Sequence, residues 1–166
     1  LIGCILTHRI DGKLLGGRIV ETEAYLSKDD PACHASKGKS KRNETMFAPA
    51  GISYVYLIYG MYNCVNVVSG REGKGEAVLI RALEPLFNIE NLCSGPGKLT
   101  QALSISREHN GLCLRQSELR VHTRNSFKMD MPKARIVTST RIGITKGVEL
   151  PLRFLLAGNT FVSKPA

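Results

Sequence analysis

The sequence has no C-x-x-C pair, and its five cysteines are odd in number and widely spaced, at Cys4, Cys33, Cys64, Cys93 and Cys113. This spacing predicts neither a disulfide framework nor a zinc site, and it fits a reducing intracellular compartment. There is no run of about 18 apolar residues and no basic-then-apolar leader, so the sequence predicts no membrane-spanning helix or signal peptide. We expect no metal and no other cofactor.

Acidic residues are scarce. The chain has 14 Asp and Glu against 23 Lys and Arg, which leaves a net charge of +9 over 166 residues. Between positions 98 and 146 the acids are Glu108, Glu118 and Asp130. The basic residues of the same stretch are Lys98, Arg107, Arg115, Arg120, Arg124, Lys128, Lys133, Arg135, Arg141 and Lys146. Such a field favours a polyanionic partner such as nucleic acid, and a solvated basic surface is the alternative.

The length allows one substantial core and is short for two ordinary domains, so we expect residues 1–166 to form a single domain. No internal repeat, low-complexity tract or interdomain linker is present. Because the chain starts at Leu1 with a strand-like segment, we expect a preceding N-terminal segment to be missing from this sequence.

Short β-prone segments dominate the chain. Residues 1–26 predict two or three strands, broken at the turn dipeptides 11–12 and 16–17. The strongest hairpin signal joins 52–59 to 61–69 around Gly60. Further strands are expected over 77–83, where Arg81 shares a face with Leu79 and Leu83, and over 134–144 and 150–162. A long polar loop is expected over 27–43. A helix that opens at 94–98 shows Leu99, Ala102 and Leu103 at i, i+3, i+4 spacing.

Glu23 is an acid inside one of these β-prone runs. Strict alternation places it on one face with Ile19, Glu21 and Tyr25. A carboxylate within a sheet is costly unless it is paired, hydrated or used. Glu23 could therefore be an edge acid paired with an arginine such as Arg81, or a catalytic group, and Glu21 is its competitor for the catalytic role.

All five tyrosines lie within 25–62, and four of them fall in the predicted hairpin. Tyr54 and Tyr56 share a face, where cross-strand packing is an alternative to a ligand contact. Tyr59 stands beside the turn residue Gly60 and is expected to project outward. An exposed aromatic on a basic protein suits stacking on bases or wedging into a duplex.

Two further features have weaker signals. His34 follows Cys33 but has no second ligand at metal spacing, so ordinary hydrogen bonding is expected. Residues 95–98 (GPGK) at a helix start could bind an anion or simply cap the helix, and the rest of a Walker motif is missing.

Five segments occur in a characteristic order: RIVETEAYL (18–26), DPACH (30–34), YVYLIYGMY (54–62) with Asn66, VLIRALEP (78–85) and SGPGKL (94–99). In these segments the chain resembles the alkyladenine (3-methyladenine) DNA glycosylase family, and the resemblance extends to 135–144 and 151–154. It implies an α+β fold: a single compact domain around a curved, mainly antiparallel β-sheet, with a protruding β-hairpin and flanking helices. One departure is that only residues 86–93 separate Glu84-Pro85 from Ser94, either through a deletion or because a loop is missing here.

By this resemblance Glu23 is the general base that activates the attacking water, with Arg81 and Asn66 as its neighbours. The implied site residues are Tyr25, Ala32, His34, Tyr56, Asn66 and Leu79 for the base pocket, Tyr59 and Met61 for DNA intercalation, and Lys98 and Arg141 for the DNA backbone.

The implied activity is that of a monofunctional DNA glycosylase of base excision repair. It would flip 3-methyladenine, 7-methylguanine, hypoxanthine or etheno-adenine out of duplex DNA and hydrolyse the N-glycosidic bond. We expect a monomer that works inside the cell on damaged double-stranded DNA and needs no membrane. The alternatives are a non-catalytic lesion-binding or DNA-bending protein, and a small hydrolase with non-nucleic substrates.

Overall fold

The structure, a computed structural model, describes residues 1–127 and 135–166; Lys128, Asp130, Lys133 and Ala134, which entered the sequence-based expectations, lie outside the described residues. The strands are β1 (Ile5–Ile10), β2 (Lys13–Tyr25), β3 (Ser53–Ile58), β4 (Tyr62–Val68), β5 (Ala77–Phe87), β6 (Leu119–His122), β7 (Ile136–Ser139) and β8 (Arg153–Leu156). The helical segments are α1 (Pro96–Ala102) and two short 3-10 turns, η1 (Glu44–Phe47) and η2 (Arg107–His109).

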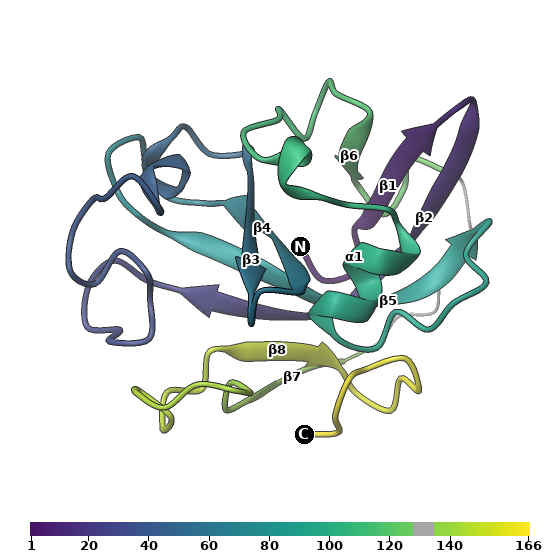
Figure 1. Cartoon of the computed structure of the whole chain (residues 1–166). Coiled ribbons are helices and arrows are strands. Elements are labelled where there is room, and N and C mark those ends of the chain that lie inside the picture. The colour runs from purple at the N-terminus through teal and green to yellow at the C-terminus, as the bar shows by residue number, and fades with distance from the viewer. Residues whose placement is uncertain (128–134) are drawn as a thin grey trace.

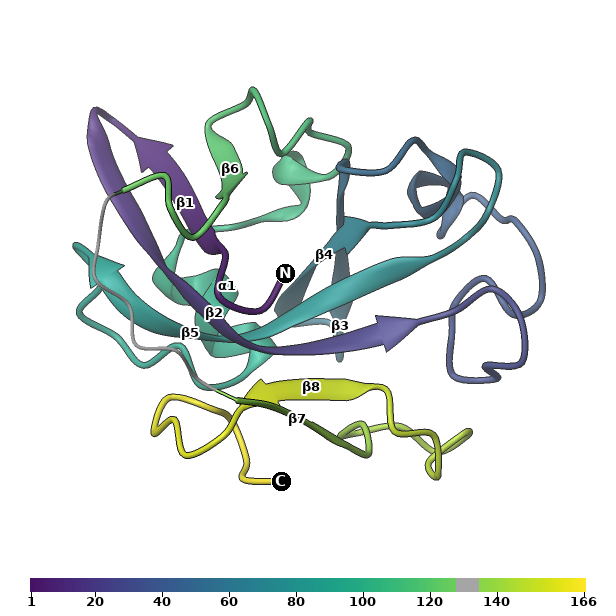
Figure 2. The ribbon, with the colours of Figure 1, turned by 180° about the vertical axis from the view of Figure 1, so that it is seen from behind.

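The strands form one antiparallel sheet in the order β3-β4-β5-β2-β1-β6, while β8 pairs with β2 and β7 pairs with β8 (Figure 1). The sheet is strongly curved, as the view from behind shows (Figure 2). Helix α1 packs against β4 and β5. The predicted α+β fold around a curved antiparallel sheet is confirmed.

The main core lies between the sheet, α1 and the segment that follows the helix. Leu99 and Leu103, which the helical spacing placed on one face, are fully buried there with Ile19, Ile80 and Leu83. Burial of apolar surface provides the main stabilisation of such a fold. The helix therefore fixes β4 and β5, which carry Asn66, Leu79 and Arg81 of the site described below.

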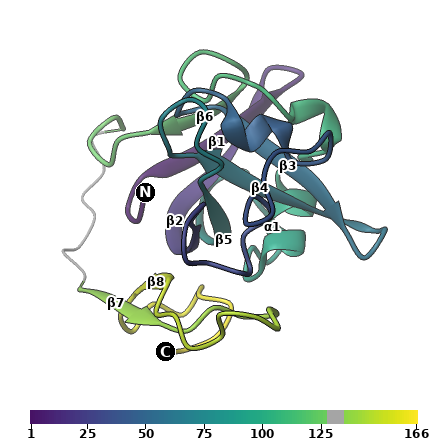
Figure 3. The ribbon, with the colours of Figure 1, turned by 90° about the vertical axis from the view of Figure 1, so that its left-hand side faces the viewer.

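Two tight turns match the sequence signals. Asp11 and Gly12 connect β1 to β2, and Tyr59, Gly60 and Met61 connect β3 to β4; the first two residues of each connection have positive φ. Positive φ at two consecutive turn residues matches the twist of the flanking strands. The β3–β4 hairpin extends away from the rest of the ribbon (Figure 3), so the predicted protruding hairpin is confirmed.

The predicted break at Gly16-Gly17 is wrong, because β2 runs through both glycines. A Cβ atom at Gly16 would meet the carbonyl oxygen of Leu6 at 2.7 Å, and one at Gly17 would collide with the carbonyl oxygen of Glu84. Here the glycines permit close approach of β1 and β5 from both sides instead of making a turn. Strand β5 likewise continues past Leu83 to Phe87.

Strict alternation along β2 is also wrong. The β2–β5 register shifts on both sides of Glu21, so that Ile19 lies opposite Leu83 and Glu21 lies opposite Ala82. Ile19 and Leu83 face the main core, whereas Ala82 belongs to a second small apolar cluster with Val20. A β-bulge of this kind re-aims side chains, so Arg81 and Leu83 do not share a face as predicted.

The outer edge of β3 is closed by the loop after η2. The amide of Ser53 donates to the carbonyl of Leu112 at 2.9 Å, and Gly111 donates to the carbonyl of Ser53 at 2.8 Å. The amide of Val55 donates to Oδ1 of Asn110 at 2.9 Å. The inner part of this edge, at Ser53 and Val55, thus has partners within the chain.

Within the two described ranges, no helix has the length and apolarity needed to cross a membrane.

Candidate active site

Glu23 lies on β2 between β5 and β8, opposite Leu79 on one side and Arg153 on the other. Its side chain is completely buried. The Tyr25 hydroxyl donates to Oε2 at 2.9 Å, the amide of Ile142 donates to Oε1 at 2.7 Å, and Nη1 of Arg81 lies 3.2 Å from Oε1. A buried carboxylate with donors of this kind is held in one orientation. Oε2 accepts only one of these bonds and retains acceptor capacity.

A cavity of about 590 Å³ lies directly beside this carboxylate, and all three donor residues, Tyr25, Arg81 and Ile142, line it. Ala32, His34, Tyr56 and Leu79, which the resemblance placed in a base pocket, are also in its wall. Pockets of this size hold small organic ligands. The structure therefore brings six of the predicted pocket and catalytic residues to one cavity, with Glu23 just behind its wall.

Asn66 lies deeper than predicted. It is on β4 opposite Leu79, which in turn lies opposite Glu23, so one strand separates Asn66 from the carboxylate. Its Nδ2 donates to the carbonyl of Tyr54 at 2.9 Å. It lines an inner recess together with Tyr25 and Tyr56. Asn66 thus belongs to the far wall of the site and does not contact Glu23.

Aromatic rings form one wall of the cavity. His34 meets Tyr56 edge-on with ring centroids 4.7 Å apart, and its Nδ1 lies 3.0 Å from the Tyr54 hydroxyl. Burial, with a smaller contribution from the charge of Arg42, lowers the pKa of His34, so the ring is neutral at pH 7. Burial raises the pKa of Tyr54 to about 12 and also raises that of Tyr56. The wall is uncharged at neutral pH and suits an electron-poor ring.

The loop that supplies Ala32 and His34 is tied to the fold at both ends. Asp30 accepts hydrogen bonds from the amides of Leu26 and Ala32 at 3.0 and 3.1 Å. Nδ2 of the buried Asn43 donates to the carbonyl of His34 at 2.8 Å. The predicted long loop over 27–43 is confirmed, and these bonds hold its first and last residues in place.

Arg141, which was predicted to contact the DNA backbone, lies inside the protein. Its side chain is completely buried and binds both oxygens of Asp30, at 2.7 and 2.6 Å. Its guanidinium also lies 4.7 Å from the ring centroid of Tyr25. Burial raises the pKa of Asp30, but the bonds from Arg141 and from the amides of Leu26 and Ala32 outweigh it and hold that pKa below its usual value. Arg141 is an internal ion-pair partner and offers no exposed surface to a phosphate.

Glu21, the competing candidate for the catalytic base, is also completely buried, and neither acid is itself a lining residue of the cavity. All three donors to Glu23 line the cavity, whereas Arg81 is the one donor to Glu21 that does. Arg81, Arg153 and Ser163 occupy both of its oxygens. The geometry therefore favours Glu23 over Glu21 as the group that meets a ligand.

The hairpin tip is the most exposed apolar feature beside the cavity. Tyr59 is 78% exposed and Met61 is 64% exposed. Tyr59 and Tyr62 line the mouth of the cavity, as does the exposed Lys98 on α1. These positions agree with a wedge and a phosphate contact, and both roles stay predictions.

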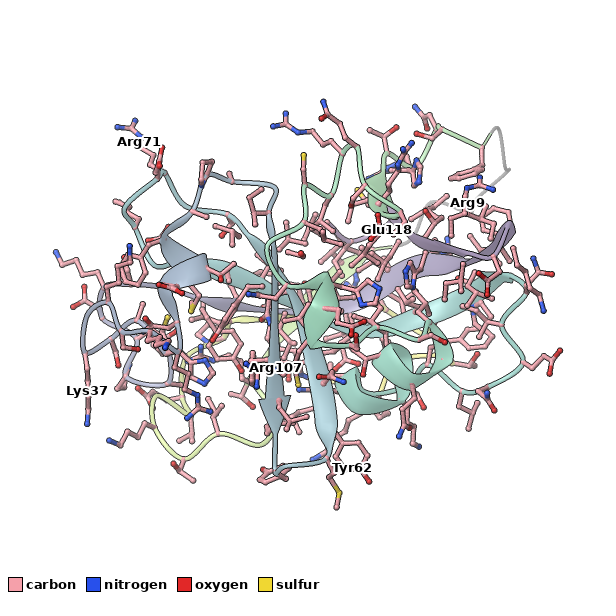
Figure 4. All side chains as sticks on the ribbon, turned by 45° about the horizontal axis from the view of Figure 1, so that its top comes forward. Arg9, Lys37, Tyr62, Arg71, Arg107 and Glu118 are labelled. Atoms are coloured by element: carbon pink, nitrogen blue, oxygen red, sulfur yellow. The ribbon has the colours of Figure 1, made fainter. Side chains whose placement is uncertain are left out.

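Basic side chains surround the outer part of the long loop. Lys37, Lys39, Lys41 and Arg42 are all exposed within the few residues that follow His34. Figure 4 shows Lys37 pointing away from the ribbon, on the loop side of the molecule. The charge surplus thus lies partly next to the cavity.

Sequence reasoning missed several contributors. The amide of Ile142 binds Glu23, and a backbone donor leaves no trace in residue type. Arg153 lay in a matched segment and Ser163 just beyond a predicted strand, and neither had a signal that tied it to the site. Within residues 1–127 and 135–166, no group of three or more His, Cys, Asp or Glu side chains could hold a metal ion.

Comparison with known proteins gives one consistent result. A model of the family described as methylpurine-DNA glycosylase matches residues 1–160. A protein of Methanoculleus marisnigri is 49% identical over an alignment that covers 99% of this chain and 90% of that protein. Proteins of Carboxydothermus hydrogenoformans and Francisella tularensis are 48% and 46% identical with the same coverage. All three relatives are named as 3-methyladenine DNA glycosylases.

Proposed function

Because this chain belongs to the methylpurine-DNA glycosylase family, we propose that it hydrolyses the N-glycosidic bond of damaged purines with a water molecule activated by Glu23. The chain is an enzyme of the DNA glycosylase class, and its partner is DNA. Neither a purely DNA-bending protein nor a hydrolase of non-nucleic substrates fits that membership.

The observation that carries the proposal is the placement of Glu23. Its three donors form part of the cavity wall, so a ligand in the cavity lies against the residues that orient the carboxylate. Glycoside hydrolysis passes through an oxocarbenium-like sugar. A fixed anion at that position stabilises the sugar cation and accepts the proton of the attacking water.

Access to the bond requires extrusion of the nucleotide from the duplex, which costs a few kcal/mol. The exposed Tyr59 at the hairpin tip is suited to fill the gap in the base stack, with Met61 beside it. Lys98 at the cavity mouth is suited to bind a backbone phosphate. Damaged bases pair poorly, so they leave the stack more readily than normal ones.

The cavity chemistry also supports the proposed range of lesions. Tyr25 and Tyr56 offer ring faces to a cationic or electron-poor base such as 3-methyladenine or 7-methylguanine. Hypoxanthine and etheno-adenine leave as neutral bases and need a proton. The lowered pKa of His34 makes its ring a poor source of that proton at pH 7.

Single-turnover release of free base from duplexes with one defined lesion tests the proposal. We expect wild-type protein to release the base and Glu23→Gln to lose at least about a hundredfold in rate, because the general base is removed. Affinity for the lesion duplex should stay within about twofold, since the side-chain volume is retained. Retained turnover in Glu23→Gln, with loss in Glu21→Gln, would assign the base to Glu21.

We also propose that the enzyme is monofunctional, since among the described residues the one lysine that lines the cavity is Lys98, which stands at its mouth and does not contact Glu23. Borohydride treatment during turnover should trap no covalent protein–DNA adduct. A trapped adduct that disappears in Lys98→Gln would show lyase chemistry instead.

A further inference from the structure

Behind Glu23 lies a buried chain of four charged side chains. Nη1 of Arg81 is 3.2 Å from Oε1 of Glu23, and Nε of the same arginine is 3.3 Å from Oε1 of Glu21. Nη1 of Arg153 is 3.0 Å from that same Glu21 oxygen. The two acids are fully buried, and the two arginines are 9% and 3% exposed. Arg81 is thus shared between two carboxylates, of which only Glu23 adjoins the cavity wall.

Glu21 is held firmly on its other side. The amide of Ser163 donates to its Oε2 at 2.6 Å, and the Ser163 hydroxyl donates to its Oε1 at 2.9 Å. Arg153 is in turn held by the carbonyls of Thr140, Lys164 and Pro165 at 2.8 to 3.1 Å. The C-terminal residues therefore dock onto the ion pair behind the catalytic strand.

The backbone is adapted to this arrangement. Register shifts on both sides of Glu21 turn its side chain away from the main core, toward β8 and the chain end. A buried carboxylate is costly to desolvate, and replacement of a buried ion pair by apolar residues often stabilises a protein. Glu21 neither lines the cavity nor packs in the apolar core, so we looked for a role of its charge in the reaction.

We propose that Glu21 is a positioning residue for the reaction: by sharing Arg81, it limits how much of that positive charge acts on Glu23 and so keeps Glu23 an effective base. This inference rests on the proposed function of Glu23. If Glu21 is neutral, Arg81 binds Glu23 alone and makes Glu23 a weaker base. If Glu21 instead loses a donor, it attracts Arg81 more strongly and Glu23 becomes more basic.

Other groups around Glu23 do not produce the same effect. Tyr25 on β2 and Cys64 on β4 both have raised pKa values, that of Cys64 about 11, mainly through burial, so they stay protonated in acid. Arg141 faces Tyr25 and Arg153 lies opposite Glu23 on β8, and both are common to every variant compared below. His34 in the cavity wall titrates in the acidic range, but it is common to every variant compared below.

The test is the pH dependence of single-turnover base release for wild type, Glu21→Gln and Ser163→Ala, between about pH 4.5 and 9. In Glu21→Gln the acidic limb should move to lower pH by at least about half a unit, and the plateau rate should fall about tenfold, as expected for a weaker base. Affinity for the lesion duplex should change less than about twofold, because Glu21 does not line the cavity.

Ser163→Ala should give the opposite shift. It removes one donor from Oε1 of Glu21 and keeps the backbone bond, so the acidic limb should move to higher pH while the fold is retained. Because this change is small, it decides the question even if Glu21→Gln fails to fold. Glu84→Gln, which removes the charge from the part-buried Arg18–Glu84 pair away from the cavity, is the control and should leave the pH profile unchanged.

Opposite shifts in the two variants support the proposal. A profile that does not move, or that moves the same way in both, overturns it and leaves Glu21 a purely structural ion. Failure of the proposed function looks different, because Glu23→Gln would then retain base release whatever the Glu21 variants do.

Discussion

The hydroxyl of Tyr25 donates a 2.9 Å hydrogen bond to Oε2 of Glu23, two residues earlier on β2. One side chain therefore offers a ring face to the cavity and orients the carboxylate behind it. Burial, together with the charge of Glu23, raises the pKa of Tyr25, so the hydroxyl stays a donor over the whole working range. Under the proposed function, Tyr25 couples binding in the cavity to the orientation of the general base.

Tyr25→Phe separates the two roles, because it keeps the ring and removes the donor. A hydrogen bond to the ionised form of a carboxyl favours that form, so its loss should move the acidic limb of the pH–rate profile to higher pH. We expect the rate to fall about tenfold, the scale of one charge-assisted hydrogen bond. Tyr25→Leu should also weaken affinity for the lesion duplex. An unmoved acidic limb in Tyr25→Phe would contradict the coupling.

Tyr59→Ser tests the wedge. The side chain is 78% exposed, so the folded protein should keep its stability within about 0.5 kcal/mol. Affinity for a duplex with an abasic analogue should fall by about tenfold, the scale of one lost base–aromatic stack. Leu57→Ser, on the same hairpin, is the comparison. Unchanged affinity in Tyr59→Ser would exclude insertion of this ring into the duplex.

Asp30→Asn should be strongly destabilising. The change leaves the completely buried guanidinium of Arg141 without its anion, and loss of one partner of a buried pair costs about 3–5 kcal/mol. The neighbouring Asp29 is exposed and has a φ of 59°, which asparagine tolerates, so Asp29→Asn is a matched control. Urea unfolding of both variants measures the difference. Equal stabilities of the two variants would show that the Asp30–Arg141 pair does not stabilise the fold.

Mild acid should also weaken the fold through histidine. Burial lowers the pKa of His8, whose Nδ1 lies 2.7 Å from the carbonyl of Leu103, and it lowers those of His34 and His122. The unfolded chain then takes up protons first. The free energy of unfolding should therefore have its highest value above about pH 6.5 and decline as the pH falls below that value.

Urea titrations at pH 7.5 and 5.5 measure that decline. His8→Asn keeps a donor near the carbonyl of Leu103 and cannot titrate, so it should show a smaller loss between the two pH values than wild type. An equal loss in both proteins would assign the effect to other groups.

Local signals predicted what depends on a few adjacent residues. The turns at Asp11-Gly12 and Tyr59-Gly60 and the apolar face of α1 follow from backbone preference and spacing, and all three are confirmed. The outward position of Tyr59 follows from the same turn.

Long-range pairing explains the errors. The sequence of Gly16 and Gly17 is typical of a turn, but the two glycines are needed because β1 and β5 pack closely against them. The bulge at Glu21 depends on register with β5, and the burial of Arg141 depends on Asp30, far away in sequence. Neither a register nor a distant partner is visible in the spacing of residues along one strand.

The hydrogen bonds from the loop at 110–112 to the edge of β3 also affect self-association of the protein. The hairpin must present Tyr59 and Met61 to solvent, and an exposed apolar tip on an open sheet edge is a template for association between copies. Bonds from Ser53 and Val55 to residues 110–112 occupy the inner part of that edge. These bonds shorten the free edge beside the exposed tip, which leaves less backbone for another chain to pair with as an added strand.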